Sequence, residues 1–238
     1  MSFMVKRLAH PLYHKITASP AVRKRCARAL WGGLYRDWCA ANPCPEFSER
    51  NALYEHVVAT EGLAGRPGDR GTEGPIDYIE FGVYKGETLL WWAGRNSHPE
   101  SSFTGFDCFE GLPEAWEDCA TGAFDTGGAV PQTSDPRCHF VKGYFQDTVL
   151  DWVVGHAFRH RRVVHLDADL YSSTLLALVT LSPRLGPGDI LIFDEFDSYD
   201  HEFRAFHEAS LVYPRSYRVL GRTRGWRQVA LRIEPGTT

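Results

Sequence analysis

Acidic side chains stand at the ends of four short apolar segments of the sequence. If these segments are parallel strands, their carboxyl ends meet at one edge of a sheet, which is where open α/β sheets bind ligands. Carboxylates gathered on one edge repel one another unless a cation or a positively charged ligand compensates them; the alternative is that each one caps the next helix or is solvated. The number of acids favours a ligand site. They are Glu80, Asp107, Asp167, Asp169, Asp194 and Glu195.

The turn after the first apolar segment is rich in glycine and reads Glu80-Phe-Gly-Val-Tyr-Lys-Gly86. Its two glycines let the backbone turn tightly and approach a ligand. The spacing differs from the dinucleotide-binding G-x-G-x-x-G, because Tyr84 occupies the middle position. The acid before the glycines also repels phosphate, whereas Asp107 can accept both hydroxyls of a ribose. The combination, with aromatic residues such as Phe145 nearby, favours S-adenosylmethionine over NAD.

Two of the acidic segments lie at an interval that predicts a metal site. Asp167 precedes Asp194 by 27 residues, which accommodates one helix, a Gly-Pro-Gly turn and one strand, so the two strand ends lie side by side. Asp167, Asp194 and Glu195 then present carboxylate oxygens to a hard cation, above all Mg²⁺. The alternative is that Asp194 caps the next helix and that Glu195 is solvated.

A general base is expected in the same place. Asp169 lies on the loop of Asp167 and is either a further metal ligand or the base. A metal that binds a substrate hydroxyl lowers the pKa of that hydroxyl, so that a weak carboxylate base suffices. His201, in the loop after the last acidic segment, is the second candidate base.

The elements that must position these residues are those of an α/β fold. Five short apolar segments alternate with helical or loop stretches, which is typical of parallel strands covered on both faces. At the C-terminus, 217–223 and 227–233 alternate in polarity around a short turn and predict a β-hairpin. The five segments are Ile76–Phe81, Ser102–Phe106, His139–Val141, Arg162–Leu166 and Asp189–Phe193.

The chain divides, by its patterns, into a helical extension over residues 1–70 and an α/β domain over 71–238. Apolar residues at spacings of three and four predict helices over 21–38 and 48–60. Residues 113–137 form an insertion rich in Gly, Pro and Asp, and a stretch of this length is usually a functional loop or lid. Trp116, within it, is placed to cover an acceptor molecule.

Composition excludes several classes of protein. With 43% hydrophobic and 24% charged residues the chain is globular, not disordered or coiled-coil. Residues 1–50 carry a charge of +6 and the whole chain −4, which leaves −10 for the remainder and argues against a nucleic-acid partner. No apolar run approaches the ~20 residues of a membrane span. The six cysteines lack zinc-type spacing, so we expect reduced thiols in a cytoplasmic protein without stable membrane insertion.

Four segments, in order over about half of the chain, resemble the macrocin O-methyltransferase (TylF/MycF) family of S-adenosylmethionine-dependent enzymes. The resemblance implies a class I methyltransferase fold, Rossmann-like, with seven strands of which the last is antiparallel. It also implies Mg²⁺-dependent methylation of a hydroxyl, characteristically on a sugar of a glycosylated antibiotic. The segments are Glu80-Phe-Gly-Val-Tyr-Lys-Gly86, Phe106-Asp-Cys-Phe-Glu-Gly-Leu-Pro113, Lys142-Gly-Tyr-Phe-Gln-Asp-Thr148 and His165-Leu-Asp-Ala-Asp-Leu-Tyr-Ser-Ser-Thr174.

The resemblance also carries site residues. By position, Asp167, Asp194 and Glu195 match the family's metal ligands, and Asp169 matches its general base. Family members often have a second Asp where this chain has Glu195. The glutamate keeps the negative charge but places its carboxylate one methylene farther from the backbone. The cofactor-binding residues that we expect lie in or next to the matching segments: Glu80, Phe81, Gly82, Val83, Tyr84, Gly86, Thr88, Asp107, Gly143, Phe145 and Asp167.

Other functions remain open at this point. Asp167-Ala-Asp169 is also a D-x-D that can hold Mn²⁺ and a sugar nucleotide in a glycosyltransferase, although Glu80 and Asp107 would then face phosphates. A catechol or another vicinal diol would need the same metal as a sugar. A third hypothesis is a methyltransferase-like module that binds the cofactor or a partner chain without catalysing a reaction. The basic N-terminal helices are also candidates for pairing two subunits.

Overall fold

The computed structural model describes residues 19–68 and 74–236. The chain divides into two compact units, residues 1–42 and 43–238. The described part of the first unit is one helix, α2 (Pro20–Ala41), which confirms the helix expected there and has no buried residue. Pairing of subunits through the N-terminal helices stays a prediction. None of the described helices is both long and apolar enough to span a membrane.

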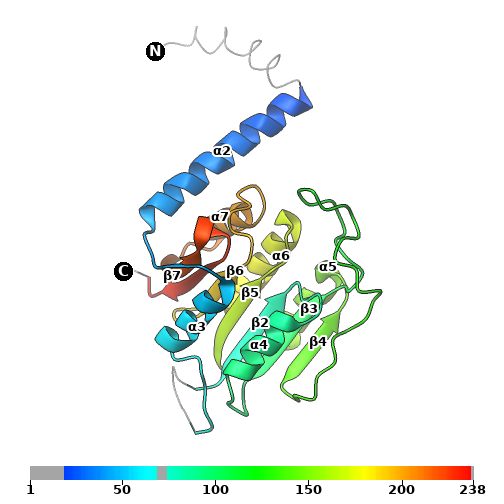
Figure 1. Cartoon of the computed structure of the whole chain (residues 1–238), viewed down its shortest axis with the longest axis vertical. Coiled ribbons are helices and arrows are strands. Elements are labelled where there is room, and N and C mark those ends of the chain that lie inside the picture. The colour runs from blue at the N-terminus through cyan, green and yellow to red at the C-terminus, as the bar shows by residue number, and fades with distance from the viewer. Residues whose placement is uncertain (1–18, 69–73, 237–238) are drawn as a thin grey trace. The chain divides into compact units, whose positions relative to one another are not determined.

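Among the described residues, the second unit forms one eight-stranded sheet (Figure 1). Neighbouring strands are parallel, except that β8 is antiparallel to both β6 and β7. The structure thus confirms an α/β fold with a mostly parallel sheet and an antiparallel C-terminal hairpin. In spatial order the strands are β1 (Glu46–Phe47), β7 (Ser216–Thr223), β8 (Val229–Glu234), β6 (Ile190–Phe193), β5 (Arg161–Leu166), β2 (Ile76–Phe81), β3 (Ser102–Asp107) and β4 (Cys138–Lys142).

Helices cover both faces of this sheet, α3 and α4 on one side and α5, α6 and α7 on the other (Figure 1). Each presents apolar side chains at helical spacing to the sheet; in α4 these are Leu89, Trp92 and Ala93. These α4 residues pack with strand residues such as Tyr78 and Phe103 into a hydrophobic core. The helices are α3 (Arg50–Glu61), α4 (Glu87–Arg95), α5 (Phe145–Gly155), α6 (Tyr171–Leu181) and α7 (Glu202–Val212).

The segment before the first predicted strand extends the sheet. The resemblance implies seven strands, and the structure adds an eighth, because Glu46 and Phe47 pair in parallel with Arg222 and Thr223 of β7. The following helix α3 buries Leu53 and other apolar residues in the core. Residues 43–61 therefore belong to the α/β unit, and the compact units meet at residue 42 rather than at the predicted boundary, residue 70.

The connection from β3 to β4, residues 108–137, is ordered by its own hydrogen bonds. Leu112 N–H donates to the Ala123 carbonyl, and Gly122 N–H donates back to the Leu112 carbonyl. At the end of the connection, Arg137 donates to the Ala93 carbonyl in the last turn of α4, to the Asn96 and His98 carbonyls after it, and to the Asp135 carboxylate. The segment 113–137 is thus a folded loop, and its action as a lid stays a prediction.

The backbone crosses itself closely at Gly82. The Gly82 N–H donates to the Phe106 carbonyl of β3, and the Asp167 N–H donates to the Phe81 carbonyl of β2. Gly82 has φ 87°, and a Cβ placed there would lie 1.7 Å from the Asp167 carbonyl oxygen. Only glycine fits, because both the left-handed backbone and the close approach exclude a side chain. This crossing places the loops after β2 and β5 in direct contact.

Replacing Gly82 should therefore destabilise the α/β unit. We expect Gly82→Ala to lower the free energy of unfolding by about 2–5 kcal/mol through overpacking and a disfavoured φ. The matched control is Gly94→Ala in α4, where an added Cβ meets no atom within 4 Å. This substitution should raise the free energy of unfolding by about 0.5–1 kcal/mol, because alanine favours the helix more than glycine does. Urea denaturation measures both. Equal stability of the two variants would show that the crossing tolerates a side chain.

Candidate active site

A cavity of about 350 Å³ lies at the carboxyl ends of the strands. The loops after β2, β3, β4, β5 and β6 line it, together with Arg50 at the start of α3. The parallel sheet delivers these loops to one edge, as expected for an open α/β fold. Ten of the predicted site residues meet in this lining: Gly82, Val83, Tyr84, Asp107, Gly143, Phe145, Asp167, Asp169, Asp194 and Glu195.

The other five predicted residues are not part of the lining. Glu80 and Phe81 end β2 with their side chains in the interior. Gly86 is the N-cap of α4, with φ 79°, and Thr88 is buried in the first turn of that helix. His201 is the N-cap residue of α7, and its Nδ1 accepts the Tyr171 N–H at 3.2 Å. The roles predicted for these residues in cofactor binding and proton transfer stay predictions.

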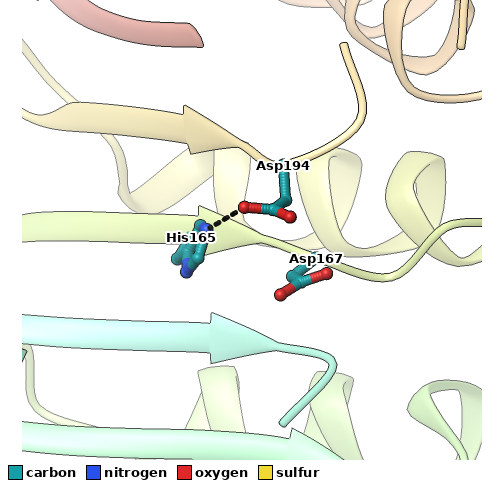
Figure 2. Close-up of side chains that lie close together, drawn as sticks. All are labelled: His165, Asp167 and Asp194. Atoms are coloured by element: carbon teal, nitrogen blue, oxygen red, sulfur yellow. Dashed lines mark ion pairs between the residues drawn. The ribbon is translucent and has the colours of Figure 1, made fainter. Parts of the chain in front are cut away.

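A buried histidine that the sequence analysis did not single out connects two of the acids. The His165 imidazole at the end of β5 is fully buried. It lies 3.7 Å from Glu80 on one side and 3.7 Å from Asp194 on the other, the pair drawn in Figure 2. Two tyrosine hydroxyls bridge these pairs. Tyr78 bonds to His165 and donates to Glu80 at 2.6 Å, while Tyr54 bonds to His165 and donates to Asp194 at 3.1 Å.

This arrangement makes His165 a buried cation. Burial alone lowers the pKa of an imidazole, but the two carboxylates outweigh burial and raise the pKa of His165 to about 10. Burial likewise disfavours ionised Asp194, but His165 and Arg50 lower the pKa of Asp194 to about 2. A charged imidazole has no free lone pair for a metal. In this charged form His165 compensates the carboxylates of Glu80 and Asp194 inside the protein.

Asp167 is the acid that two clusters share, and Figure 2 shows the first of them, with His165 and Asp194. Its ligand atoms lie within 4.8 Å of His165 and Asp194 in one cluster, and of Asp169 and Glu195 in the other. Asp167 is therefore close to both other predicted metal ligands, although those two are not grouped with each other. The second cluster is all carboxylate, which is the donor set that a hard cation prefers.

The carboxylates of the second cluster resist ionisation together. Burial and the charges of Asp194 and Glu195 raise the pKa of Asp167 well above its usual value. Burial and Asp194 raise the pKa of Asp169 to about 7, and the same two causes raise that of Glu195 to about 8. Glu195 Oε1 accepts from Arg227 at 3.0 Å, whereas its buried Oε2 has no partner in the described structure. The site thus gathers more carboxyl groups than it can readily ionise together, and a bound cation would favour their ionised forms.

Asp107 has a structural role besides the predicted one. Its Oδ2 accepts the N–H groups of Val83 and Tyr84, both at 2.8 Å, and its Oδ1 accepts that of Phe109 at 2.7 Å. Tyr84 and Phe109 both have positive φ, a conformation that costs free energy outside glycine. One carboxylate therefore holds the two loops that flank the cavity in their strained conformations.

Three cavity or near-cavity residues went unnoticed in the sequence: His165, Arg50 and Arg227. For His165 a signal exists, because it precedes Asp167 by two residues in a strand and so shares its face of the sheet. Arg227 lies in the turn of the C-terminal hairpin, and no local pattern indicates that this turn reaches Glu195. Arg50 begins a helix far upstream, so only the tertiary fold brings it to the cavity.

Comparison with known proteins places this geometry in a family. Residues 70–210 match the family described as Macrocin-O-methyltransferase (TylF). The chain belongs to the macrocin O-methyltransferase family. Two curated relatives are O-methyltransferases by name. The 8-demethyl-8-(2,3-dimethoxy-alpha-L-rhamnosyl)-tetracenomycin-C 4'-O-methyltransferase of Streptomyces olivaceus is 29% identical over 68% of this chain and 66% of its own. Demethyldecarbamoylnovobiocin O-methyltransferase of Streptomyces niveus is 26% identical over 53% and 55%.

The chain spans just under two thirds of the first of these relatives and about half of the second. Solved structures agree on the fold of this macrocin O-methyltransferase family member. A calicheamicin methyltransferase superposes with a TM-score of 0.53 at 22% identity, covering 76% of each chain. The O-methyltransferase NovP superposes with a TM-score of 0.53 at 19% identity, covering 88% of this chain and 96% of NovP. The fold is that of class I methyltransferases.

The crowding of acids predicts an unusual effect of a neutral substitution. The pKa of Asp167 is higher in the folded protein than in the unfolded chain. Asp167 therefore lowers the free energy of unfolding at every pH above its pKa in the unfolded chain, which is near 4, and this loss grows as the pH rises. We expect Asp167→Asn to raise the melting temperature in EDTA at pH 7 by about 2–4 °C, on the scale of 1 kcal/mol. The gain should vanish at pH 4. A lower melting temperature at pH 7 would contradict the charge crowding.

Proposed function

We propose that the protein is an S-adenosylmethionine- and Mg²⁺-dependent O-methyltransferase that acts on a hydroxyl of a sugar in a glycosylated natural product, as in antibiotic biosynthesis. Membership of the macrocin O-methyltransferase family supports methyl transfer. The names of the two curated relatives, a rhamnosyl-tetracenomycin and a novobiocin methyltransferase, support the acceptor class. The observation that carries the proposal is the carboxylate cluster of Asp167, Asp169 and Glu195 in the cavity beside the glycine turn.

The cofactor is assigned to the part of the cavity nearest the glycine turn. S-adenosylmethionine supplies a methyl group on a positively charged sulfur, which suits a cavity with an excess of carboxylates. Gly82, where the close backbone approach excludes a side chain, lines this part of the cavity. The Asp107 carboxylate accepts two N–H groups at Oδ2 and one at Oδ1, which leaves about one lone pair, on Oδ1, for a ribose hydroxyl. Phe145 and Gly143 line the same side and leave room for a flat base.

The donor set also fits a divalent cation. Asp167 lies within 4.8 Å of Asp194, Asp169 and Glu195, and the buried Glu195 Oε2 has no partner among the described residues. We assign Asp167, Asp194 and Glu195 as the residues that would hold Mg²⁺. A bound divalent cation lowers the pKa of a coordinated hydroxyl and orients neighbouring acceptor oxygens.

Asp169 is the residue to which we assign proton transfer. Its carboxylate lines the cavity, and its pKa of about 7 leaves a large ionised fraction at neutral pH. In the reaction the acceptor oxygen forms a bond to the methyl carbon while the S–CH₃ bond breaks and sulfur keeps the electron pair; the hydroxyl proton passes to Asp169. His201 is a weaker candidate, because it is not in the lining and its Nδ1 already accepts a backbone N–H.

The insertion 113–137 is assigned to the acceptor. Its first part lies against α6 and the loop between β6 and α7: Ser172 donates to Glu114 at 2.8 Å and Ser198 donates to Glu117 at 3.1 Å. These bonds hold Trp116 in the cavity wall, where it is buried and Leu112, also part of the lining, is half-buried. An apolar wall opposite the carboxylates suits a sugar carried on an aglycone.

Replacing Asp169 tests the proton transfer. We expect Asp169→Asn to lower kcat for methyl transfer about 10²–10⁴-fold, with little change in the affinity for S-adenosylhomocysteine. The matched control is Asp118→Asn, an exposed acid of the insertion outside the lining, which should keep full activity. Mass spectrometry of a panel of glycosylated antibiotics detects the methylated product. Normal kcat in Asp169→Asn would exclude this residue as the base.

Removing the metal or its central ligand tests the cation. We expect calorimetry to detect Mg²⁺ binding to the wild-type protein and to Asp118→Asn, and none to Asp167→Asn, because that substitution removes the carboxylate shared by both clusters. EDTA should abolish methyl transfer and added Mg²⁺ should restore it. If Asp167→Asn binds Mg²⁺ as tightly as the wild type, the assigned ligand set is wrong.

A further inference from the structure

The first turn of α3 faces the cavity. Arg50 is the first residue of this helix and lines the cavity with Gly82, Asp167 and Asp194. One turn later, Tyr54 is buried and donates to Asp194 at 3.1 Å. Residues four apart share one face of a helix, and the core fixes that face because Tyr54 packs there. The helix therefore holds the Arg50 side chain at the cavity.

Arg50 is available for a ligand. No carboxylate of the described residues lies within 4.0 Å of its guanidinium. The other arginine of the lining, Arg227, is already committed to Glu195 at 3.0 Å. Burial lowers the pKa of Arg50, but the charges of Asp194 and Asp167 outweigh it, so the guanidinium stays charged and near the acids without pairing to one of them.

We infer that Arg50 binds the carboxylate of the amino-acid end of the cofactor. This inference rests on the proposed use of S-adenosylmethionine. The cofactor carries a sulfonium, an ammonium and a carboxylate, and the first two are attracted by the acids of the cavity. The third is repelled by them and needs a cation, for which a guanidinium offers a two-pronged hydrogen-bonding partner.

The position of Arg50 fits this role better than that of another cation near the glycine turn. Lys85 follows Tyr84 and lies over its ring, with Nζ 4.9 Å from the ring centroid, and it is not part of the lining. Arg50 lines the cavity beside Gly82, the position of closest backbone approach, while lying outside residues 70–210 that match the family. The helix upstream of the matched region thus completes the cofactor site.

Calorimetry with two ligands tests the inference. The full chain is titrated with S-adenosylhomocysteine and with its decarboxylated analogue, which keeps the ammonium and the nucleoside but lacks the carboxylate. We expect the wild type to prefer S-adenosylhomocysteine about 10- to 100-fold, as for a hydrogen-bonded charge pair. Arg50→Gln should lose this preference, Arg50→Lys should keep part of it, and the control Lys85→Gln should keep all of it.

The outcomes separate this inference from the proposed function. Arg50 is exposed, so Arg50→Gln should melt within about 2 °C of the wild type, a shift below 1 kcal/mol. If Arg50→Gln keeps the wild-type preference for S-adenosylhomocysteine, or weakens the binding of both ligands equally, Arg50 does not bind the carboxylate. If the wild type binds neither ligand while folded, the proposed cofactor itself is wrong.

Discussion

The site depends on electrostatic compensation at the carboxyl edge of the sheet. Parallel strands bring acids from several loops into one cavity, and their mutual repulsion would oppose folding if nothing balanced it. Inside the protein, His165 supplies one positive charge and divides it between Glu80 and Asp194 through two tyrosine hydroxyls. Of the carboxyl groups around Asp167, Glu195 pairs with Arg227, but the pKa of Asp167 is still raised by burial and by its acidic neighbours. In our account a divalent cation and a sulfonium balance these acids.

The fold sets the distances that make this balance possible. Strands β5 and β6 are neighbours in parallel register, so Asp167 and Asp194, which follow their ends, lie side by side. The crossing at Gly82 brings the loop after β2 against the loop after β5. The Asp107 carboxylate then joins the loops after β2 and β3 by accepting their backbone N–H groups. Binding residues and reacting residues thus share one rigid frame.

Much of this arrangement could be predicted from the sequence. Short apolar segments with acids at their ends indicate parallel strands, and all five predicted segments are strands of the sheet. What could not be predicted depends on contacts between distant segments. The two-residue strand β1 has no pattern of its own and exists because β7 offers it an edge. The inward orientation of Glu80 follows from its bond to Tyr78, and Arg50 reaches the cavity only through the packing of α3.

The most direct test of this account is the location of a divalent cation by anomalous diffraction. Crystals would be grown with S-adenosylhomocysteine and Mn²⁺, which replaces Mg²⁺ in oxygen sites and scatters anomalously. The account predicts one strong anomalous peak in the cavity, about 2.2 Å from a carboxylate oxygen of Asp167. A fully liganded cofactor site with no peak beside Asp167, or with the peak elsewhere on the molecule, would contradict the claim that a cation balances these acids.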